Sequence, residues 1–292
     1  MMNKIHENKT WKIGGDLTVN RFGYGAMRIT GKGIWGKPEN EEEAIKVLKK
    51  AIECGVNFID TADSYGPNVS ENLIAKALYP YPKDLVIATK GGFERTGPDR
   101  WVINAHPDHL KSVLEGSLKR LKLDHIDLYQ LHRVDPKVPF DETIGFLKQA
   151  QEKGLIKYIG LSEVSVAEIK KAQEQIKIVS VQNKYSLTFR KWEPELKYCL
   201  EQKMAFIPWN PIIASRLNPD EKIKQMAEKY AVTESQLILK WLFNHSENIL
   251  LIPGTSSVKH LEENLNAENI HFSPEDFNAI NQAALEAISV GK

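Results

Sequence analysis

The sequence predicts a (β/α)8 TIM barrel, an α/β fold in which a closed parallel sheet is surrounded by helices. Apolar β-type runs alternate with helical segments along most of the 292 residues, and eight such runs can be counted. This alternation implies parallel strands joined by right-handed crossovers. Several runs end on a polar residue, as expected of a barrel with its active site at the carboxyl ends of its strands. No Pro/Ser linker or repeat marks a boundary, so we expect a single domain over 1–292.

The first expected element is a β-hairpin. The segment TWKIGGDLTVNRFGYG alternates polar and apolar residues around Gly14-Gly15-Asp16, which supply the turn. We expect this hairpin to close the bottom of the barrel, where the core would otherwise meet water. The eight barrel strands are then expected near residues 22–24, 56–60, 85–89, 126–132, 158–162, 178–182, 205–209 and 249–253.

The helices are expected where apolar residues recur with a 3.6-residue period. Segments with this pattern lie between the strands, at residues 41–54, 107–121, 140–153, 166–175, 194–202 and 221–230. Two more helical segments do not fit the simple repeat, and we expect them to be extra helices, at residues 234–243 and 274–287.

The composition restricts the class of protein. With 42% hydrophobic and 26% charged residues, the chain can build a large core, and its formal net charge of +1 gives no support for a nucleic-acid partner. Cys54 and Cys199 lie on separate expected helices, which suggests a reducing compartment. No C-x-x-C spacing supports a metal site. The amino terminus lacks an apolar signal region and no run is long enough to span a membrane, so a cytoplasmic location is expected. The oligomeric state stays open.

A glycine motif offers a rival interpretation. Residues Gly31 to Gly36 (GKGIWG) match G-x-G-x-x-G, and Asp60 ends the next strand, as in a Rossmann dehydrogenase. In that motif the helix begins inside the glycine turn, so that its N-terminus meets the pyrophosphate. Here Lys37 to Asn40 intervene, with Asn40 as the expected N-cap. The spacing favours a loop over the top of the barrel.

Polar residues at successive strand ends form the strongest functional signal. VNFID ends on Asp60, DLVIATK on Lys90 and IDLYQLH on His132, and Tyr65 follows five residues after the first of these. Carboxyl ends of barrel strands meet at one rim, so these four side chains are expected to converge. An acid, an amine, a phenol and an imidazole at one place can deliver a proton to a carbonyl.

Each of the four groups has a chemical role in this interpretation. Tyr65 is the candidate general acid, and the Lys90 ammonium is expected to lower its pKa, which is about 10 for a free phenol. Asp60 would pair with Lys90, and His132 would orient the substrate oxygen. None is an obvious nucleophile, so hydride from a nicotinamide would complete the reaction. A hydrolase using Asp60 and Asp63 as paired carboxylates is the weaker alternative, because it leaves Lys90 and His132 without a role.

These residues lie in strings that resemble the aldo-keto reductase superfamily. The strings occur in family order from near residue 13 to beyond residue 265: GGDLTVNRFGYGAMR, NFIDTADSYG, ATKGG, DLYQLHRVD, KGLIKYIGLSE, VQNKYS and IPGTSSVKHLEENL. The resemblance implies a barrel reductase that acts on small-molecule carbonyl substrates and uses NADPH without a Rossmann fold. It places the family's catalytic tetrad on Asp60, Tyr65, Lys90 and His132. A cofactor-binding regulatory protein with little turnover is the alternative within the same family.

The resemblance also implies a cofactor site along later strand ends. Ser162 and Gln182 would bind the nicotinamide carboxamide, and Trp209 would stack on the nicotinamide ring. The segment Gly254–Ser257 follows the eighth strand and opens a helix, which independently favours an anion there. The other implied cofactor contacts are Ala26, Met27, Arg28, Asp60, Asn210, Pro211, Gly254, Thr255, Ser256, Ser257, His260, Glu263 and Asn264.

Two positions depart from the family pattern. Glu163 stands where many relatives have Asn, and His260 stands where many have an Arg against the 2′-phosphate. The second change makes NADH use plausible beside NADPH, because a guanidinium binds phosphate more strongly. The carboxyl-terminal tail is short, so the substrate pocket is expected to be open there. Its wall would come from the 93–106 segment and from Trp35, Phe93 and Trp101.

Overall fold

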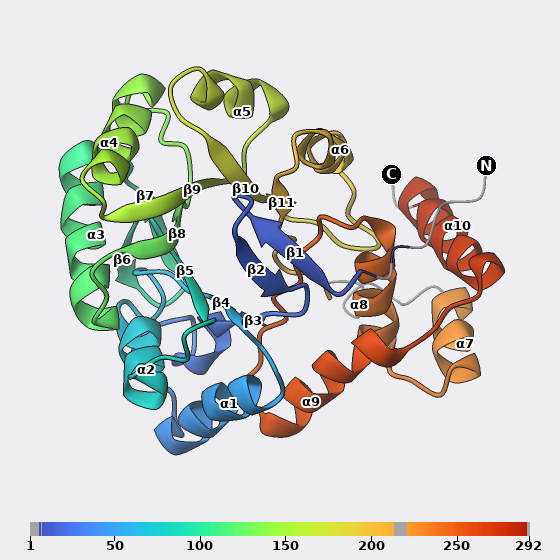
Figure 1. The fold of residues 1–292 in the computed structure, drawn as a ribbon. Coiled ribbons are helices and arrows are strands. Elements are labelled where there is room, and N and C mark those ends of the chain that lie inside the picture. Colours follow the sequence, from blue (N-terminus) through green and yellow to red (C-terminus); the bar gives the residue numbers. More distant parts are fainter. Residues whose placement is uncertain (1–5, 7, 213–220, 291–292) are drawn as a thin grey trace.

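The computed structural model describes residues 6, 8–212 and 221–290. Its central sheet has seven parallel strands in the order β11-β10-β9-β8-β5-β4-β3. The sheet curls into a barrel ringed by helices (Figure 1). These strands are β3 (Tyr24–Gly25), β4 (Phe58–Asp60), β5 (Val86–Gly91), β8 (Ile126–Leu131), β9 (Ile156–Ser162), β10 (Ile178–Gln182) and β11 (Ala205–Phe206).

The eighth predicted strand closes the barrel through backbone hydrogen bonds. On one side, Leu250 donates its N–H to the carbonyl of Phe206 at 2.9 Å. On the other side, Gly23 donates to Leu251 at 2.8 Å, and Leu251 donates to Arg21 at 2.7 Å. Only isolated parallel bridges form here, Phe206 with Ile249 and Phe22 with Leu251, so the segment is not a regular strand. The predicted (β/α)8 barrel is confirmed.

The predicted hairpin covers one end of the barrel. It consists of β1 (Thr10–Ile13) and β2 (Leu17–Asn20), paired antiparallel. Ile13 and Val19 are fully buried and pack with side chains of the barrel interior. Gly14 has φ +66°, and a Cβ there would lie 2.3 Å from the Tyr158 ring, so the turn requires glycine for both conformation and space. The hairpin therefore seals the end opposite the carboxyl ends of the strands.

The helices match the predicted alternation with additions. The described α-helices are α1 (Glu41–Glu53), α2 (Val69–Leu78), α3 (Pro107–Leu121), α4 (Phe140–Glu152), α5 (Val166–Gln173), α6 (Glu193–Glu201), α7 (Glu221–Lys229), α8 (Glu234–His245), α9 (Val258–Asn266) and α10 (Pro274–Val290). Helix α2 was not predicted. A second unpredicted element is the antiparallel hairpin of β6 (Phe93–Gly97) and β7 (Arg100–Ile103).

The two helices outside the simple repeat are α7 and α10, which pack against each other at the edge of the barrel (Figure 1). The sequence singled out 234–243 together with the last helix. In the structure, α8 takes the place beside the barrel, because nearly all of its residues are buried, including Leu239, Trp241 and Phe243. Helix α7 buries only Ile223 and Ala227.

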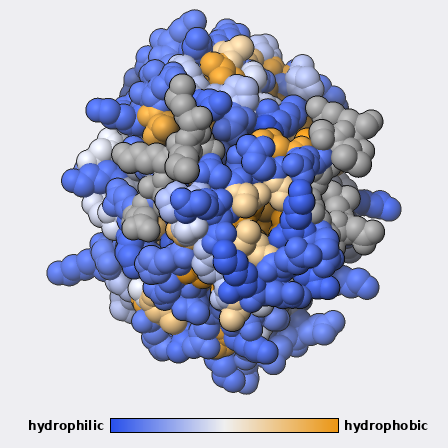
Figure 2. All heavy atoms as spheres, turned by 90° about the vertical axis from the view of Figure 1, so that its right-hand side faces the viewer, coloured by the Kyte–Doolittle hydropathy of each residue, from blue (hydrophilic) through white to orange (hydrophobic). Residues whose placement is uncertain are grey.

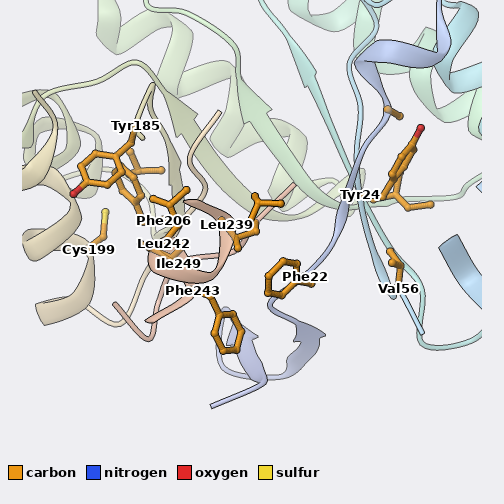
Figure 3. Packing of buried hydrophobic residues seen from close by; sticks show 14 of the residues in the cluster. Phe22, Tyr24, Val56, Tyr185, Cys199, Phe206, Leu239, Leu242, Phe243 and Ile249 are labelled. Carbon is orange, nitrogen blue, oxygen red and sulfur yellow. The ribbon is translucent and has the colours of Figure 1, made fainter. Parts of the chain in front are cut away.

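The core lies on both sides of the barrel wall. One apolar cluster fills the space between the strands and the surrounding helices (Figure 3). In it, the rings of Phe22 and Phe243 lie 5.3 Å apart, centroid to centroid, and join the first strand region to α8. A smaller cluster fills the barrel interior with Phe58, Val86 and Leu128, one from each of three strands. The interior is therefore a packed layer on which the polar rim rests.

The face that carries α7 and α10 is mostly hydrophilic, with a small group of apolar residues in a hollow near its centre (Figure 2). Among the residues that the structure describes, no helix is both long enough and apolar enough to cross a membrane.

Arg21 is a buried cation that holds the closing segment in place. It is fully buried, and its guanidinium donates to the carbonyls of Ile249 (3.0 Å), Phe243 (2.6 Å) and Ser246 (2.5 Å). A fourth hydrogen bond reaches the carbonyl of Asn8 at 2.8 Å. The side chain thus links the first strand to α8 and the eighth strand. Burial lowers the pKa of Arg21 to about 10. This value is still far above neutral pH, so the guanidinium stays charged.

Replacing Arg21 by Met should destabilise the barrel by at least about 3 kcal/mol, because buried carbonyls lose a charged donor. Urea unfolding of Arg21→Met and wild type measures the difference. Arg100→Met is the matched control, because Arg100 is exposed on β7 and a surface change should stay within about 0.5 kcal/mol. Equal unfolding midpoints for the two variants would contradict the role of Arg21.

Candidate active site

The period-2 alternation of the strands brings the predicted tetrad together. In β4, Phe58 faces the barrel interior, so Asp60 two residues later faces the same way. In β5 the interior residues Val86 and Ala88 precede Lys90 in the same manner. His132 directly follows β8, and Tyr65 lies in the loop between β4 and α2. The apolar residues fill the lower interior, and the polar residues lie at its carboxyl-terminal rim.

Lys90 is the centre of the site. Its fully buried Nζ donates to Asp60 Oδ2 at 2.6 Å, to the carbonyl of Thr61 at 2.8 Å and to the Tyr65 hydroxyl at 3.2 Å. An ammonium has three protons to donate, and all three are used. The Tyr65 ring also lies 5.9 Å from the His132 ring, edge to face. The structure therefore places the four predicted residues in one cluster.

The charges of this cluster are set by burial and by each other. Burial acts to lower the pKa of Lys90, but the negative charge of Asp60 and the Tyr65 hydroxyl outweigh it, and the net shift is upward. Burial raises the pKa of Tyr65 above 10.0, and the Lys90 ammonium reduces this shift only in part. Lys90 lowers the Tyr65 pKa as the sequence suggested, but burial outweighs this effect and the net shift is upward. The phenol is protonated at neutral pH.

His132 is neutral in this setting. Its pKa lies well below 6.5 because burial disfavours the imidazolium and because Lys90, Arg133 and Arg95 add positive charge. Its Nδ1 lies 3.5 Å from the Ser64 hydroxyl. If the serine donates to Nδ1, the other ring nitrogen carries the proton and can donate it to a substrate oxygen.

Asp60 is held from its other side by two amides. Its Oδ1 accepts from Gln130 Nε2 at 3.0 Å and from Gln182 Nε2 at 2.9 Å. Gln182, which the sequence predicts to bind the nicotinamide carboxamide, therefore donates its side-chain nitrogen to Asp60. Its Oε1 has no hydrogen bond within the described residues, so this oxygen is the atom left to accept from a ligand.

The predicted nicotinamide wall lies at the next strand ends. Ser162 ends β9, and its hydroxyl is 3.0 Å from Arg133 Nη1, which donates to it. The indole Nε1 of Trp209 donates to Glu163 Oε1 at 2.7 Å. The same Glu163 oxygen also accepts from the Lys184 backbone. Glu163, which the sequence marked as a departure from the family, thus fixes the orientation of the predicted stacking ring.

The predicted phosphate segment leads into α9. Ser257 is the N-cap of this helix, but its side chain makes no capping hydrogen bond; its own N–H donates to Thr255 Oγ1 at 3.1 Å. The Thr255 carbonyl accepts from the buried Tyr24 hydroxyl at 2.6 Å. The Val258 N–H points to Glu43 Oε1 at 3.5 Å, so a carboxylate from α1 already lies near this helix end. Gly254 and Ser256 are exposed.

The remaining predicted cofactor residues flank this segment. His260 Nδ1 lies 2.8 Å from Glu263 Oε2 on the first turns of α9, and Asn264 is buried behind them. On the other side, Ala26 is buried at the start of the 3-10 helix η1 (Ala26–Ile29), Met27 is half-buried and Arg28 is exposed. Asn210 is exposed with φ +56°, and Pro211 is buried beside it.

Two of the aromatic residues predicted to line the substrate pocket, Phe93 and Trp101, lie around His132. The Phe93 ring lies 4.7 Å and the Trp101 ring 6.4 Å from the His132 ring. Arg95 stacks on Trp101, with its guanidinium carbon 3.6 Å from the ring centroid. Trp35 lies farther out, 5.8 Å from the same guanidinium carbon.

Arg95 joins the pocket loops. It donates to the carbonyls of Ile34 and Ser64 at 2.8 Å each, to Gly33 and Arg100 at 3.0 Å each, and to Gly97 at 3.3 Å. These acceptors lie on two separate loops and on the β6–β7 hairpin. Arg95 therefore links the β6–β7 hairpin to the tetrad loop, the loop between β4 and α2 that carries Tyr65. Its nitrogens already donate to backbone carbonyls.

The two rival interpretations fail on geometry. The Gly31–Gly36 segment is a turn-rich loop, closed by a 3.0 Å hydrogen bond from Gly31 N to Gly36 O, and α1 begins only after the Asn40 cap. This is the arrangement expected for a loop and not for a Rossmann turn. Asp60 is paired with Lys90, whereas Asp63 is buried with its Oδ1 unpartnered among the described residues. Asp60 already accepts hydrogen bonds from Lys90, Gln130 and Gln182 through both of its oxygens, so it is not available as one member of a hydrolytic pair.

Sequence reasoning missed Gln130, Arg133 and the role of Glu163. Gln130 was within reach of the same alternation argument, because it lies two residues after the interior residue Leu128 on β8. The link between Glu163 and Trp209 had a weaker signal: an indole brings an N–H that needs an acceptor, and an unusual carboxylate follows Ser162. Within the described residues, no group of three or more His, Cys, Asp or Glu side chains is arranged to hold a metal ion.

A barrel with an acid, an amine, a phenol and an imidazole at its carboxyl-terminal rim has the architecture of a barrel enzyme. Comparison with known proteins identifies the family. Residues 21–285 match the aldo/keto reductase family profile, which covers most of the chain. The chain therefore belongs to the aldo/keto reductase family, an oxidoreductase family.

Individual relatives agree with this assignment. An uncharacterized oxidoreductase of Schizosaccharomyces pombe is 48% identical over 264 residues, covering 90% of this chain and 86% of the relative. The pyridoxine 4-dehydrogenase of Escherichia coli is 38% identical over 267 residues, covering 89% and 93%.

Solved structures agree on the fold. A thermostable aldo-keto reductase crystallised with the inhibitor epalrestat superposes with a TM-score of 0.82 at 29% identity, covering 94% of this chain and 99% of that one. An aldo-keto reductase from Klebsiella pneumoniae, solved with NADPH, gives a TM-score of 0.78 at 24% identity, covering 94% of each chain.

Removing Lys90 should lower the free energy of unfolding, because Asp60 then stays buried without its partner. Lys90→Met leaves the Asp60 carboxylate unpaired and should destabilise the protein by about 3–5 kcal/mol. The double variant Lys90→Met/Asp60→Asn removes that charge as well and should be more stable than Lys90→Met by about 2 kcal/mol. Urea unfolding of both variants at neutral pH measures this. Additive losses in the double variant would contradict the pairing.

Proposed function

We propose that this protein is an NADPH-dependent oxidoreductase that reduces aldehydes and ketones to alcohols, with Tyr65 as the general acid. The observation that carries the proposal is the Lys90 ammonium, which bridges Asp60 at 2.6 Å and the Tyr65 hydroxyl at 3.2 Å beside a neutral His132. Membership of the aldo/keto reductase family supports the reaction class.

Each of the four side chains has a separate role toward a bound carbonyl substrate. The rings of Tyr65 and His132 lie 5.9 Å apart, which is close enough for both to donate to one carbonyl oxygen and hold it. As negative charge develops on that oxygen, Tyr65 transfers its proton, and Lys90 stabilises the phenolate left behind. Asp60 keeps Lys90 charged and aimed at Tyr65. The reduced nicotinamide supplies the hydride that the protein cannot.

The residues present suit a nicotinamide cofactor. Gln182 Oε1 is free to accept from the carboxamide, and the Ser162 hydroxyl lies at the adjacent strand end. Trp209 presents a ring held by Glu163. The first turn of α9, with the uncommitted Ser257 side chain at its N-cap, suits a phosphate. The remaining contacts proposed for the cofactor are those expected from the sequence.

We propose NADPH as the preferred cofactor, with NADH as a weaker one. Support comes from the Klebsiella pneumoniae structure, solved with NADPH. Against an exclusive preference, His260 pairs with Glu263 and Glu43 lies near the start of α9, so carboxylates already face this region. A 2′-phosphate would have to compete with them.

Tyr65→Phe should lower kcat for carbonyl reduction by at least about 100-fold, because the acid is removed. The assay is NADPH oxidation with a panel of aldehydes and ketones, together with the pyridoxine–pyridoxal couple, since one relative is named a pyridoxine 4-dehydrogenase. NADPH affinity, measured by calorimetry, should be retained, because Phe preserves the ring. Equal rates for Tyr65→Phe and wild type would exclude the mechanism, and NADPH binding without turnover in wild type would indicate a regulatory protein.

The pH dependence should separate a raised from a lowered Tyr65 pKa. Reduction needs Tyr65 protonated and His132 neutral; the Tyr65 pKa lies above 10.0 and the His132 pKa well below 6.5. The kcat/KM for reduction should therefore be flat from about pH 7 to about pH 9 and fall only above about pH 10. A fall centred near about pH 8 would show that the phenol ionises early, against the structure.

A further inference from the structure

Arg133 is a cation in the candidate site that the mechanism does not use. It directly follows His132 at the end of β8 and is half-buried. Its Nη1 donates to the His132 carbonyl at 2.6 Å and to the Ser162 hydroxyl at 3.0 Å. These two contacts anchor one end of the guanidinium between the tetrad and the proposed carboxamide site.

Aromatic rings fix the guanidinium on two sides. Its central carbon lies 5.4 Å from the Phe93 ring centroid and 5.7 Å from the Trp209 ring centroid. Phe93 belongs to the pocket wall around His132, and Trp209 is the proposed nicotinamide platform. The positive charge therefore lies where the substrate space and the cofactor space meet.

The charge of Arg133 is not neutralised by an ion pair. Within the described part of the chain, no carboxylate oxygen lies within 4.0 Å of its nitrogens. Glu163 exerts an attraction on Arg133, but its Oε1 is taken by the Trp209 indole and the Lys184 backbone. Among the described residues, the charge thus has no counter-ion in contact with it.

Two of its donor atoms also have no acceptor. Nε and Nη2 make no hydrogen bond to any described residue, and neither is among the fully buried polar atoms without a partner. These two nitrogens share one edge of the guanidinium, the edge that matches the two oxygens of a carboxylate. Arg95 is the contrast nearby, because backbone carbonyls take all three of its nitrogens.

We propose that Arg133 binds a negatively charged oxygen of the substrate, so that the preferred substrates carry an anionic group beside the carbonyl that is reduced. This inference rests on the proposed reductase function and adds the substrate class to it. Nη1 keeps its hydrogen bonds to His132 and Ser162 and so fixes the plane of the guanidinium. The Nε–Nη2 edge then donates to the anionic group. The Phe93 and Trp101 rings would pack on the apolar part of the same substrate.

The test compares substrates that differ in charge and hardly in shape. The carboxybenzaldehydes and nitrobenzaldehydes, each as the ortho, meta and para isomer, form such pairs. The readout is the ratio of kcat/KM for the carboxylate over the nitro compound, in the full-length protein with NADPH. A general loss from the broken contact to Ser162 affects both members of a pair and cancels in this ratio.

In wild type, at least one isomer pair should favour the carboxylate by tenfold or more. Arg133→Gln should reduce that ratio at least tenfold, mainly through KM, and Arg133→Lys should restore part of it. Lys148→Gln is the control for the loss of one positive charge, because Lys148 is exposed on α4, outside the site, and its ratio should stay within twofold of wild type. Ratios unchanged in Arg133→Gln, or a loss confined to NADPH affinity, would overturn the inference.

A binding measurement separates this inference from the proposed activity. Benzoate and neutral benzamide are titrated by calorimetry into wild type and Arg133→Gln, each saturated with NADP+. Benzoate binding that is at least tenfold tighter than benzamide binding in wild type, and lost in the variant, supports the anion site even if no aldehyde is reduced. Equal binding of benzoate to both proteins, or none to wild type, would refute it.

Discussion

The rest of the site depends on one buried charge, the ammonium of Lys90. A fully buried cation is tolerated only when every proton it carries is accepted and its charge is balanced. The three acceptors come from the end of β4, from the backbone after it and from the tetrad loop. Satisfying Lys90 therefore fixes where Asp60 and Tyr65 lie. The interactions that stabilise the charge are the same ones that aim the phenol.

Much of this arrangement could be predicted from the sequence, because it follows from strand periodicity. Residues two apart on a strand share a face, so Phe58 and Asp60 had to point to the same interior. Helix α2 was not predicted because its inner face is partly polar. Ser70 is buried against the Ala26 carbonyl, and buried Glu71 accepts from Thr89 and from Arg120. A helix that buries a hydroxyl and a carboxylate does not show the apolar stripe on which periodicity depends.

The roles of the arginines could not be predicted from the sequence. Nothing in the sequence separates Arg21, Arg95 and Arg133, which are all single cations near apolar residues. In the structure, the donors of Arg21 hold the closing segment of the barrel and those of Arg95 hold the loops, while one edge of Arg133 has no acceptor among the described residues. Which carbonyls surround a guanidinium depends on loop positions, and those depend on contacts between residues far apart in the chain. Tertiary structure decides the role, and residue type alone does not.

In the proposed mechanism, it is the protonated state of Tyr65 that suits the site to reduce a carbonyl near neutral pH. Burial raises the pKa of Tyr65 more than Lys90 lowers it, so the phenol keeps its proton until an acceptor arrives. A carbonyl oxygen that gains charge would be such an acceptor, and Lys90, 3.2 Å from the Tyr65 oxygen, would stabilise the phenolate as it forms. Oxidation of an alcohol would need that phenolate beforehand, at the cost of ionising a buried group. In the proposed mechanism, the burial that keeps Tyr65 protonated therefore suits it to donate a proton and opposes its acting as a base.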